Sequence, residues 1–385
     1  MKGRGAEAFP IDVREHARQA AIGDAQEAQV GRVPPEVVEQ RDRNDNRPPK
    51  TTEKSPAPRA PAAGQTGASG FANLPRTMPA RLVLPKWPTL HLERECEGVV
   101  CGVDEAGCAP IAGPVVAAAV MLPPGPKPRA LRGLNDSKLL PAPARERFFD
   151  LIHRIGRVGV GIATVEEIDG LNIYHADMLA MQRAVAALAE ALGAMPDVAL
   201  VDGRGRPKVS CRVRTFIKGD RRSLSIAAAS VIAKVTRDRL MQGLASRFPD
   251  YGWQTNVGYG TEVHYLGLLR KGPTEHHRRS FAPINTIFAP DGPALDRYRF
   301  CCLRERPDLE RPKLLRLRHD LHAVFDGSGH HVGVVKHLRG RWTFRAFGYA
   351  DDQRPLPGKG PCEKCHGERL DGPERRGLIR LFAAA

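Results

Sequence analysis

The chain has 385 residues and a formal net charge of +16, from 59 basic and 43 acidic side chains. This length allows about two domains with sizeable cores, and the basic excess favours a polyanionic partner such as nucleic acid. No run approaches the roughly 18 apolar residues of a membrane span, and no secretory signal opens the chain. We therefore expect a cytoplasmic protein with reduced cysteines and no membrane contact.

Residues 1–95 are rich in proline and charge and show little hydrophobic periodicity. The stretch 41–70 has the composition of a flexible linker. We predict that residues 1–95 form a disordered extension. A tether for nucleic acid is the alternative, and the small charge excess of this region argues against it.

Two apolar runs with a glycine-containing elbow between them open the next region. Residues 99–103 and 115–122 are each long enough for a buried strand and too short for a helix. Asp104 and Glu105 end the first run, and Gly107 follows them. Because side chains alternate between the two faces of a strand, both acids reach one centre only if the chain bends there. An acidic turn that caps a hairpin is the structural alternative.

Helical and strand patterns then alternate along the chain. Asn172 is a good helix cap and Gly193 a good helix terminator. This alternation predicts an α/β sheet with helices packed on it. The predicted helices are 141–156, 172–193 and 223–248, and the predicted strands are 158–165, 198–203 and a run within 213–220.

Three of the predicted strands end in carboxylates: Asp104 with Glu105, then Asp202, then Asp220. In an α/β sheet the chemistry gathers where the strand ends meet, and four crowded acids need cations to offset their repulsion. Oxygen ligands without His or Cys select Mg²⁺ or Mn²⁺. Two such ions about 4 Å apart can clamp the attacking and leaving oxygens of a phosphodiester displacement. The sequence therefore indicates a magnesium-dependent nuclease.

Eight motifs follow one another within residues 97–290: GVDEAGCAPIAGPVVAAAV, LNDSK, NIYHADMLAMQRAV, VDGRGRPK, IKGD, SIAAASVIAKVTRDRLM, GYGT and HHRRSFAPI. In these motifs and in their order the chain resembles bacterial ribonuclease HII. The resemblance implies a ribonuclease H-like fold, with a five-stranded mixed sheet, flanking helices and a helical C-terminal part. It also implies an endonuclease that cleaves the RNA strand of RNA–DNA hybrids, incises DNA on the 5′ side of embedded ribonucleotides and leaves 5′-phosphomonoesters.

The resemblance also implies roles for individual residues. The family's catalytic, metal-binding acids correspond to Asp104, Glu105, Asp202 and Asp220. Its tyrosine, which stacks on the sugar after the ribonucleotide, corresponds to Tyr259; a buried loop aromatic is the alternative. Basic side chains that can hold phosphates, or are simply solvated, are Lys138, Lys234, Arg237, Arg278 and Arg279.

One loop departs from the family pattern. Where the family has Gly-Arg-Gly, and reads 2′-hydroxyls with the main chain, this chain has Gly107, Cys108 and Ala109. Cys108 removes a positive charge and adds a thiol that oxygen-preferring Mg²⁺ does not favour. Ala109 adopts a positive φ less readily than glycine does. A catalytically weakened hybrid-binding protein is therefore the alternative to an active enzyme.

We expect three parts in the chain: the extension 1–95, a catalytic domain 96–292 and a small basic C-terminal extension 293–385. Residues 304–321 predict a short helix and a linker, and 321–347 predict three short strands. The last of these strands brings basic and aromatic residues together. They either face nucleic acid or, as we favour, form the core of a small sheet: Arg339, Arg341, Trp342, Phe344 and Arg345.

Cys362, Cys365 and His366 form a CxxCH motif near the C-terminus. Covalent haem attachment needs export, so we do not expect it. A zinc half-site needs two more ligands, which would have to fold back onto the motif, and a reduced loop without metal is favoured. The candidates for those ligands are Cys301, Cys302, His330 and His331. The chain is expected to be monomeric.

Overall fold

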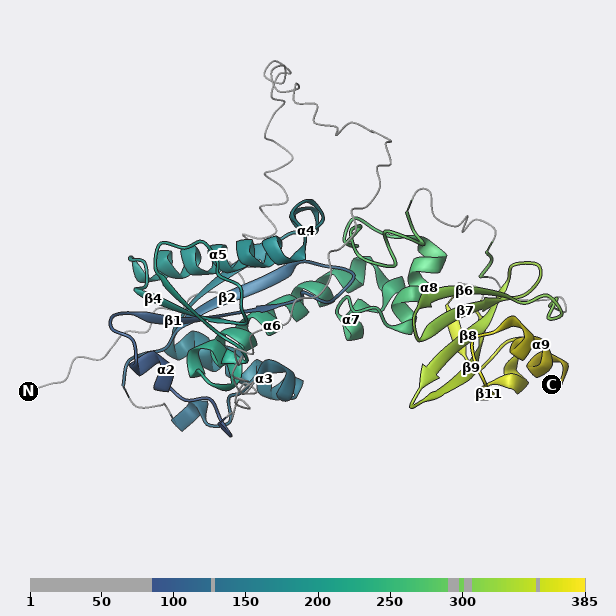
Figure 1. Cartoon of the computed structure of the whole chain (residues 1–385), viewed down its shortest axis with the longest axis horizontal. Coiled ribbons are helices and arrows are strands. Elements are labelled where there is room, and N and C mark those ends of the chain that lie inside the picture. The colour runs from purple at the N-terminus through teal and green to yellow at the C-terminus, as the bar shows by residue number, and fades with distance from the viewer. Residues whose placement is uncertain (1–84, 126–128, 290–297, 301–306, 351–353, 385) are drawn as a thin grey trace, which may run out of the picture. The chain divides into compact units, whose positions relative to one another are not determined.

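The computed structural model describes residues 85–125, 129–289, 298–300, 307–350 and 354–384 (Figure 1). Most of the predicted disordered extension, residues 1–84, lies outside the described residues. The ordered chain nevertheless begins before residue 96, because Leu92 in the short helix α2 (His91–Arg94) is buried beside Leu200 and Ile226. The described residues belong to one compact unit, Met78–Ala385.

A five-stranded mixed sheet forms the first layer of the structure, as predicted. Its strand order is β3-β2-β1-β4-β5; β1, β2 and β3 pair antiparallel, whereas β4 runs parallel to β1 and β5 parallel to β4. The carboxyl ends of β1, β4 and β5 therefore lie at one edge of the sheet. The strands are β1 (Val100–Ala106), β2 (Val115–Met121), β3 (Arg157–Ala163), β4 (Val198–Asp202) and β5 (Arg212–Phe216).

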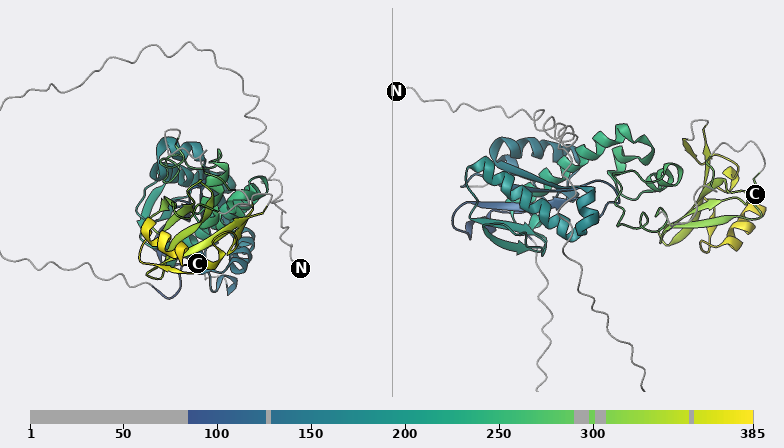
Figure 2. Two further views of the ribbon diagram at one scale, coloured as in Figure 1. Left: turned by 90° about the vertical axis from the view of Figure 1, so that its right-hand side faces the viewer. Right: turned by 90° about the horizontal axis from the view of Figure 1, so that it is seen from above.

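Helices cover both faces of this sheet. Figures 1 and 2 show α5 along one face and α6 along the other. As the sequence predicts, α5 begins at Asn172, whose side chain accepts hydrogen bonds from two backbone N–H groups, and ends at Gly193 in the left-handed conformation. The helices are α3 (Ala142–Ile155), α4 (Val165–Leu171), α5 (Ile173–Leu192) and α6 (Leu224–Arg247).

Two glycines in the sheet allow these helices to approach closely. A Cβ added at Gly102 would lie 2.2 Å from the backbone nitrogen of Ile226 in α6. A Cβ at Gly161 would lie 2.1 Å from the carbonyl oxygen of Ala180 in α5. Larger residues at either position would push a helix off the sheet.

Short helices follow α6, in agreement with the expected helical C-terminal part of the catalytic region. They are α7 (Trp253–Asn256) and α8 (Glu262–Lys271). Their buried aromatic side chains begin a second hydrophobic cluster, separate from those of the mixed sheet.

The C-terminal region forms a second sheet of six strands, where the sequence predicted three. The predicted strands correspond to β7 (Leu321–Phe325), β8 (His331–Leu338) and β9 (Arg341–Tyr349). The helix predicted within 304–321 is wrong at β6 (Lys313–Arg318), because this run pairs with β7 and buries Leu317. The remaining elements are β10 (Pro355–Pro357), β11 (Arg369–Leu370) and α9 (Arg375–Ala383).

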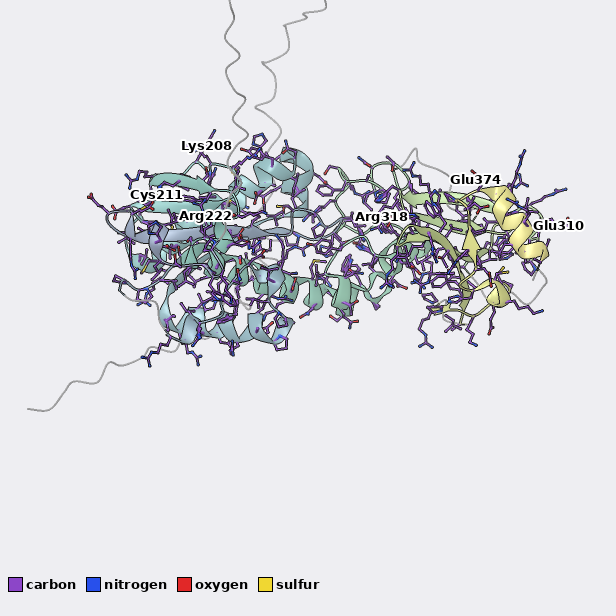
Figure 3. The ribbon with its side chains drawn as sticks, turned by 60° about the horizontal axis from the view of Figure 1, so that its bottom comes forward. Lys208, Cys211, Arg222, Glu310, Arg318 and Glu374 are labelled. Atoms are coloured by element: carbon purple, nitrogen blue, oxygen red, sulfur yellow. The ribbon has the colours of Figure 1, made fainter. Side chains whose placement is uncertain are left out.

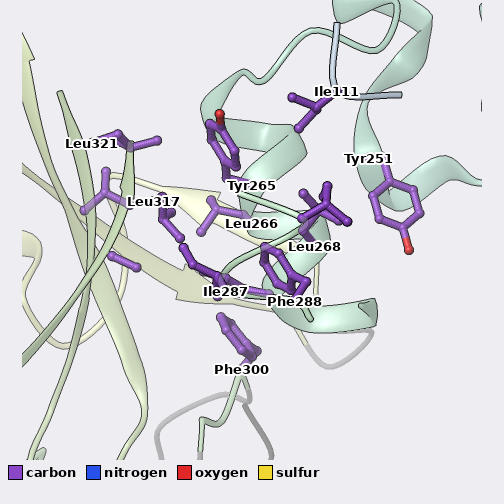
Figure 4. Close-up of a cluster of buried hydrophobic side chains, with 14 of the residues drawn as sticks. Ile111, Tyr251, Tyr265, Leu266, Leu268, Ile287, Phe288, Phe300, Leu317 and Leu321 are labelled. Atoms are coloured by element: carbon purple, nitrogen blue, oxygen red, sulfur yellow. The ribbon is translucent and has the colours of Figure 1, made fainter. Parts of the chain in front are cut away.

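One hydrophobic cluster joins the second sheet to α8. Leu317 and Leu321 of the sheet belong to the same buried cluster as Leu266 of α8 and Ile287 (Figure 4). The proposed domain boundary near residue 292 therefore falls inside a continuous hydrophobic core. A second cluster on the sheet contains Phe344, which is fully buried and so cannot face nucleic acid.

No helix among the described residues is both long and apolar enough to span a membrane.

Candidate active site

Three aspartates meet at the edge where the parallel strands end. Asp104 lies in the last part of β1, Asp202 ends β4, and Asp220 lies in the turn between β5 and α6. One carboxylate oxygen from each lies within 4.8 Å of the other two. The N–H of Gly219 donates to Asp202 Oδ1 at 2.6 Å and so holds that carboxylate in place.

The electrostatics of this cluster are unfavourable without a cation. Burial, followed by the charges of Glu105, Asp202 and Asp220, raises the pKa of Asp104 well above its usual value. Burial and Asp202 likewise raise the pKa of Asp220 to about 7. A divalent cation among these oxygens would remove the repulsion, and an all-oxygen donor set suits Mg²⁺ or Mn²⁺. The residues present therefore fit such an ion.

Glu105 points into a second group on the other face of β1. Its carboxylate lies within 4.8 Å of ligand atoms from Cys108 and Asp177. Val103, two positions before Glu105 and on the same face of β1, packs in one hydrophobic cluster with residues of α5. Strand alternation places the two adjacent side chains on opposite faces of β1, but their carboxyl groups still meet, because the Glu105 side chain makes a hydrogen bond with that of Asp104. They remain electrostatically linked, because burial and then the charge of Asp202 raise the pKa of Glu105.

Asp177, on α5, is an acid that the sequence analysis did not identify. Its Oδ1 atom is buried and has no hydrogen-bond partner in the structure. Burial, followed by the charge of Glu105, raises its pKa to about 8. The available signal was an acid beside Ala176 and Ala180, on the otherwise apolar face of a predicted helix.

Arg278 was predicted to hold a phosphate, and the structure contradicts this. The side chain is fully buried, and each of its five N–H groups donates to a backbone carbonyl. A guanidinium has only five N–H groups, so none is left for a substrate. Arg278 instead organises the loop after β1. The five acceptors are the carbonyls of Gly107, Cys108, Pro110, Gly113 and Pro114.

Arg237, also predicted as a phosphate contact, has the same structural role. It is buried and donates to the carbonyls of Ala112, Pro114 and Val257 at 2.8–3.0 Å. Gly107, with φ of +103°, passes so close that an added Cβ would lie 2.1 Å from Arg237 Nε. Gly107 is therefore required by this contact.

The altered loop does not carry the backbone strain that its sequence suggests. Among the described residues other than glycine, positive φ occurs at four positions, and Ala109 is not one of them. Ala109 is exposed and Cys108 half-buried. Burial, followed by the charges of Asp177 and Glu105, raises the pKa of the Cys108 thiol, so this thiol stays protonated at neutral pH.

Tyr259 is not a buried loop aromatic, since 42% of its surface is exposed. A buried chain of hydrogen bonds holds its backbone. Thr274 N–H donates to His277 Nδ1 at 2.9 Å, so His277 carries its proton on Nε2 and donates to His264 Nε2 at 3.0 Å. His264 Nδ1–H in turn donates to the Tyr259 carbonyl at 2.9 Å.

This series of hydrogen bonds requires both imidazoles to be neutral, so acid is expected to disrupt it. Burial lowers the pKa of His264 to about 4, and burial with the charge of His264 lowers that of His277 to about 3. Between pH 6.5 and pH 4 the unfolded chain binds protons that the folded chain excludes. As the pH falls through this range, the free energy of unfolding therefore decreases by about 1.4 kcal/mol per pH unit for each histidine.

We expect this effect to appear as a pH-dependent difference between the parent chain and His264→Gln. The parent's advantage in unfolding free energy should shrink by about 2 kcal/mol from pH 7 to pH 5, measured by urea unfolding. The acids contribute equally to both proteins and cancel in the difference. Parallel pH profiles for the two proteins would show that His264 is not held neutral.

The remaining predicted phosphate contacts differ from one another. Burial lowers the pKa of Lys138, but Asp104, Asp136 and Glu105 outweigh it and raise that pKa, so the ammonium lies in the field of the acids. Lys234 pairs with Asp238 at 2.6 Å. The Arg279 side chain is exposed.

Cys362 and Cys365 are both buried in the cluster that contains Phe344 and Leu378. Burial raises the pKa of Cys362 to about 12, so it is a neutral thiol. Within the described part of the chain, no third His, Cys, Asp or Glu lies near enough to complete a metal site there. His331 is a core residue that contacts the Tyr349 hydroxyl, and Cys301 and Cys302 lie outside the described residues.

A mixed sheet with carboxylates at its parallel strand ends defines the chain as a nuclease of the ribonuclease H-like fold. The Ribonuclease HII family model matches residues 101–284. Ribonuclease HII of Granulibacter bethesdensis is 53% identical over 205 residues, which are 52% of this chain and 92% of that protein. Ribonuclease HII of Paramagnetospirillum magneticum is 52% identical over 198 residues, 51% of this chain and 96% of that protein. The chain belongs to the ribonuclease HII family and is an endonuclease that hydrolyses phosphodiester bonds.

Among solved structures, ribonuclease H2 from Pyrococcus horikoshii is 26% identical, with a TM-score of 0.40. That match covers 48% of this chain and 95% of the archaeal one.

Proposed function

We propose that this ribonuclease cleaves the RNA strand of RNA–DNA hybrids and incises DNA on the 5′ side of embedded ribonucleotides, using divalent cations. The convergence of Asp104, Asp202 and Asp220 on one point carries the proposal, since their oxygens lie within 4.8 Å of one another. The intact acids favour an enzyme over a hybrid-binding protein without turnover.

We assign the metal ions to Asp104, Asp202 and Asp220, with Glu105 completing the set through its side-chain contact with Asp104. Two bound Mg²⁺ or Mn²⁺ ions would stabilise the charge on the attacking and leaving oxygens of the phosphodiester. Because Asp104 is buried, solvent screens its charge only weakly, which favours a cation at this site.

The substrate contacts follow from exposure and charge. Lys138 lies near the acids and is expected to attract a phosphate of the cleaved strand. Tyr259 offers an exposed ring on a held backbone, which suits stacking on the sugar after the ribonucleotide. The loop held by Arg278 brings the backbone of 107–109 beside Glu105, where it can approach the 2′-hydroxyl.

The full chain should be tested on two substrates: a DNA duplex with one ribonucleotide, and a uniform RNA–DNA hybrid. We expect cleavage of both in Mg²⁺ or Mn²⁺, and none in chelator. Tight binding of both substrates without cleavage in either metal would support the alternative, a weakened hybrid-binding protein.

The altered loop is expected to reduce selectivity for the single ribonucleotide. Restoring the family pattern with Cys108→Arg and Ala109→Gly should raise cleavage of the single-ribonucleotide duplex more than cleavage of the uniform hybrid. It should also steepen the salt dependence by about one unit of slope, because one phosphate-directed cation is added. Steady-state rates at several salt concentrations measure both effects. Equal gains on the two substrates would mean that this loop tunes affinity alone.

A further inference from the structure

Three cations of the C-terminal sheet contact the segment that directly follows Tyr259. Arg318 Nη1 donates to the Gly260 carbonyl at 3.0 Å. Lys336 Nζ and Arg345 Nη1 lie 3.3 and 3.0 Å from the same oxygen of Glu262. These contacts come from β6, β8 and β9, all beyond residue 284, where the family match ends.

Arg318 is oriented for its contact by a neighbour on its own hairpin. Asp320 accepts hydrogen bonds from Arg318 Nε and Nη2, the latter at 2.8 Å, which leaves Nη1 directed at Gly260. Arg318, labelled in Figure 3, is the last residue of β6. Because a carboxylate holds the Nε and Nη2 groups of this planar guanidinium, the direction of its remaining Nη1 group is fixed.

Glu262 forms the second contact. It lies in the first turn of α8, directly after the capping residue Thr261, and its side chain is only 10% exposed. Two cations on one nearly buried carboxylate join the start of α8 to the second sheet more strongly than exposed ion pairs would. The helix N-terminus also favours a negative charge at this position.

The opposite side of the same segment is held by the catalytic domain. His264 donates to the Tyr259 carbonyl, and Ile111 N–H donates to the Gly258 carbonyl at 3.0 Å. Val257, just before them, has a φ of 43°, which a β-branched residue adopts only under constraint. The exposed Tyr259 ring therefore projects from a strained turn that is fixed from two directions.

We propose that the C-terminal sheet is a positioning element for Tyr259, acting through Arg318 on Gly260 and through Lys336 and Arg345 on Glu262. This inference rests on the proposed role of Tyr259. The sheet thereby sets how well the enzyme distinguishes an RNA-to-DNA junction from uniform RNA. Arg318 acts through the backbone next to Tyr259 and is a positioning residue.

The test compares Arg318→Gln with Arg316→Gln, a matched control at an exposed position of the same strand. Arg318→Gln should lower kcat/KM on the single-ribonucleotide duplex about fivefold, the ratio that one ordinary hydrogen bond supplies. The uniform hybrid should be affected less. In a Tyr259→Ala background, Arg318→Gln should have no further effect on the ratio of the two rates. Glu262→Gln should repeat this pattern independently.

A second measurement does not depend on activity. Amide hydrogen exchange at residues 258–262 should be faster in Arg318→Gln than in Arg316→Gln, with the mixed sheet unchanged. Equal exchange and equal substrate ratios in the two variants would overturn the inference. So would an Arg318→Gln effect that persists in full without Tyr259. A parent chain that cleaves neither substrate would refute the proposed function, while the exchange rates would still decide whether the sheet positions this segment.

Discussion

Replacing Asp104 or Asp202 by Asn is expected to abolish cleavage and to leave the metal-free fold at least as stable as the parent. Each substitution removes one charge from a buried cluster in which the acids raise one another's pKa. The repulsion falls, and with it the affinity for a divalent cation. We expect kcat/KM on the hybrid to fall at least about a thousandfold.

Two measurements separate this result from simple unfolding. The melting temperature in chelator should match or exceed that of the parent, and added Mg²⁺ should raise it for the parent but much less for Asp104→Asn. Asp150→Asn, at an exposed position of α3, is the matched control and should leave both quantities unchanged. Near-normal turnover by Asp104→Asn in Mg²⁺ would refute the assignment of the metal site.

Physical reasons predicted an α/β sheet whose acids meet at the strand ends, whereas the five-stranded mixed topology was implied by the family resemblance. Apolar runs too short for helices define strands, and capping residues such as Asn172 and Gly193 define the ends of helices. Once β1, β4 and β5 are parallel neighbours, acids that follow them must lie at one edge of the sheet. Asp104, Asp202 and Asp220 do so.

Partners that depend on tertiary packing were not predictable in this way. Asp177 reaches Glu105 from a helix on the other face of the sheet, and nothing in its local sequence specifies that approach. The burial of Arg278 could not be predicted from the sequence either, because this residue lies in a polar run, next to the exposed Arg279. A basic residue in a basic sequence context usually reads as a surface charge.

The sequence predicted only three of the six strands in the C-terminal region, because the strand pattern of each segment is weak when it is considered alone. Half of the residues of β6 are charged (Lys313, Arg316 and Arg318) and the strand follows a proline, a composition that resembles a linker. Pairing with β7, and burial of Leu317 against the cluster around α8, make it a strand. Tertiary context has overridden local preference here.

The largest expected effect on stability is that of Arg278→Ala. The substitution removes the Arg278 donor from five backbone carbonyls of the loop between β1 and β2. Of these, the Pro114 carbonyl still accepts from Arg237, and the other four lose their guanidinium partner. Burial, followed by the charge of Arg237, lowers the pKa of Arg278 to about 9, so the carbonyls hold this cation against a real desolvation cost. Removing one side of such a buried network costs about 3–5 kcal/mol of unfolding free energy.

The matched control is the next residue along the chain. Arg279→Ala removes an exposed side chain and should change the unfolding free energy by less than about 0.5 kcal/mol. Arg278→Lys should fall between the two, because an ammonium keeps the charge but has three N–H groups in place of five. Urea unfolding of the three variants measures this order. The loop shaped by Arg278 carries Cys108 and directly follows the end of β1, where Glu105 lies, so Arg278→Lys should lose cleavage even where it remains folded. If Arg278→Ala were as stable as Arg279→Ala, the loop would be held by its glycines and prolines alone, and Arg278 would be free to serve the substrate after all.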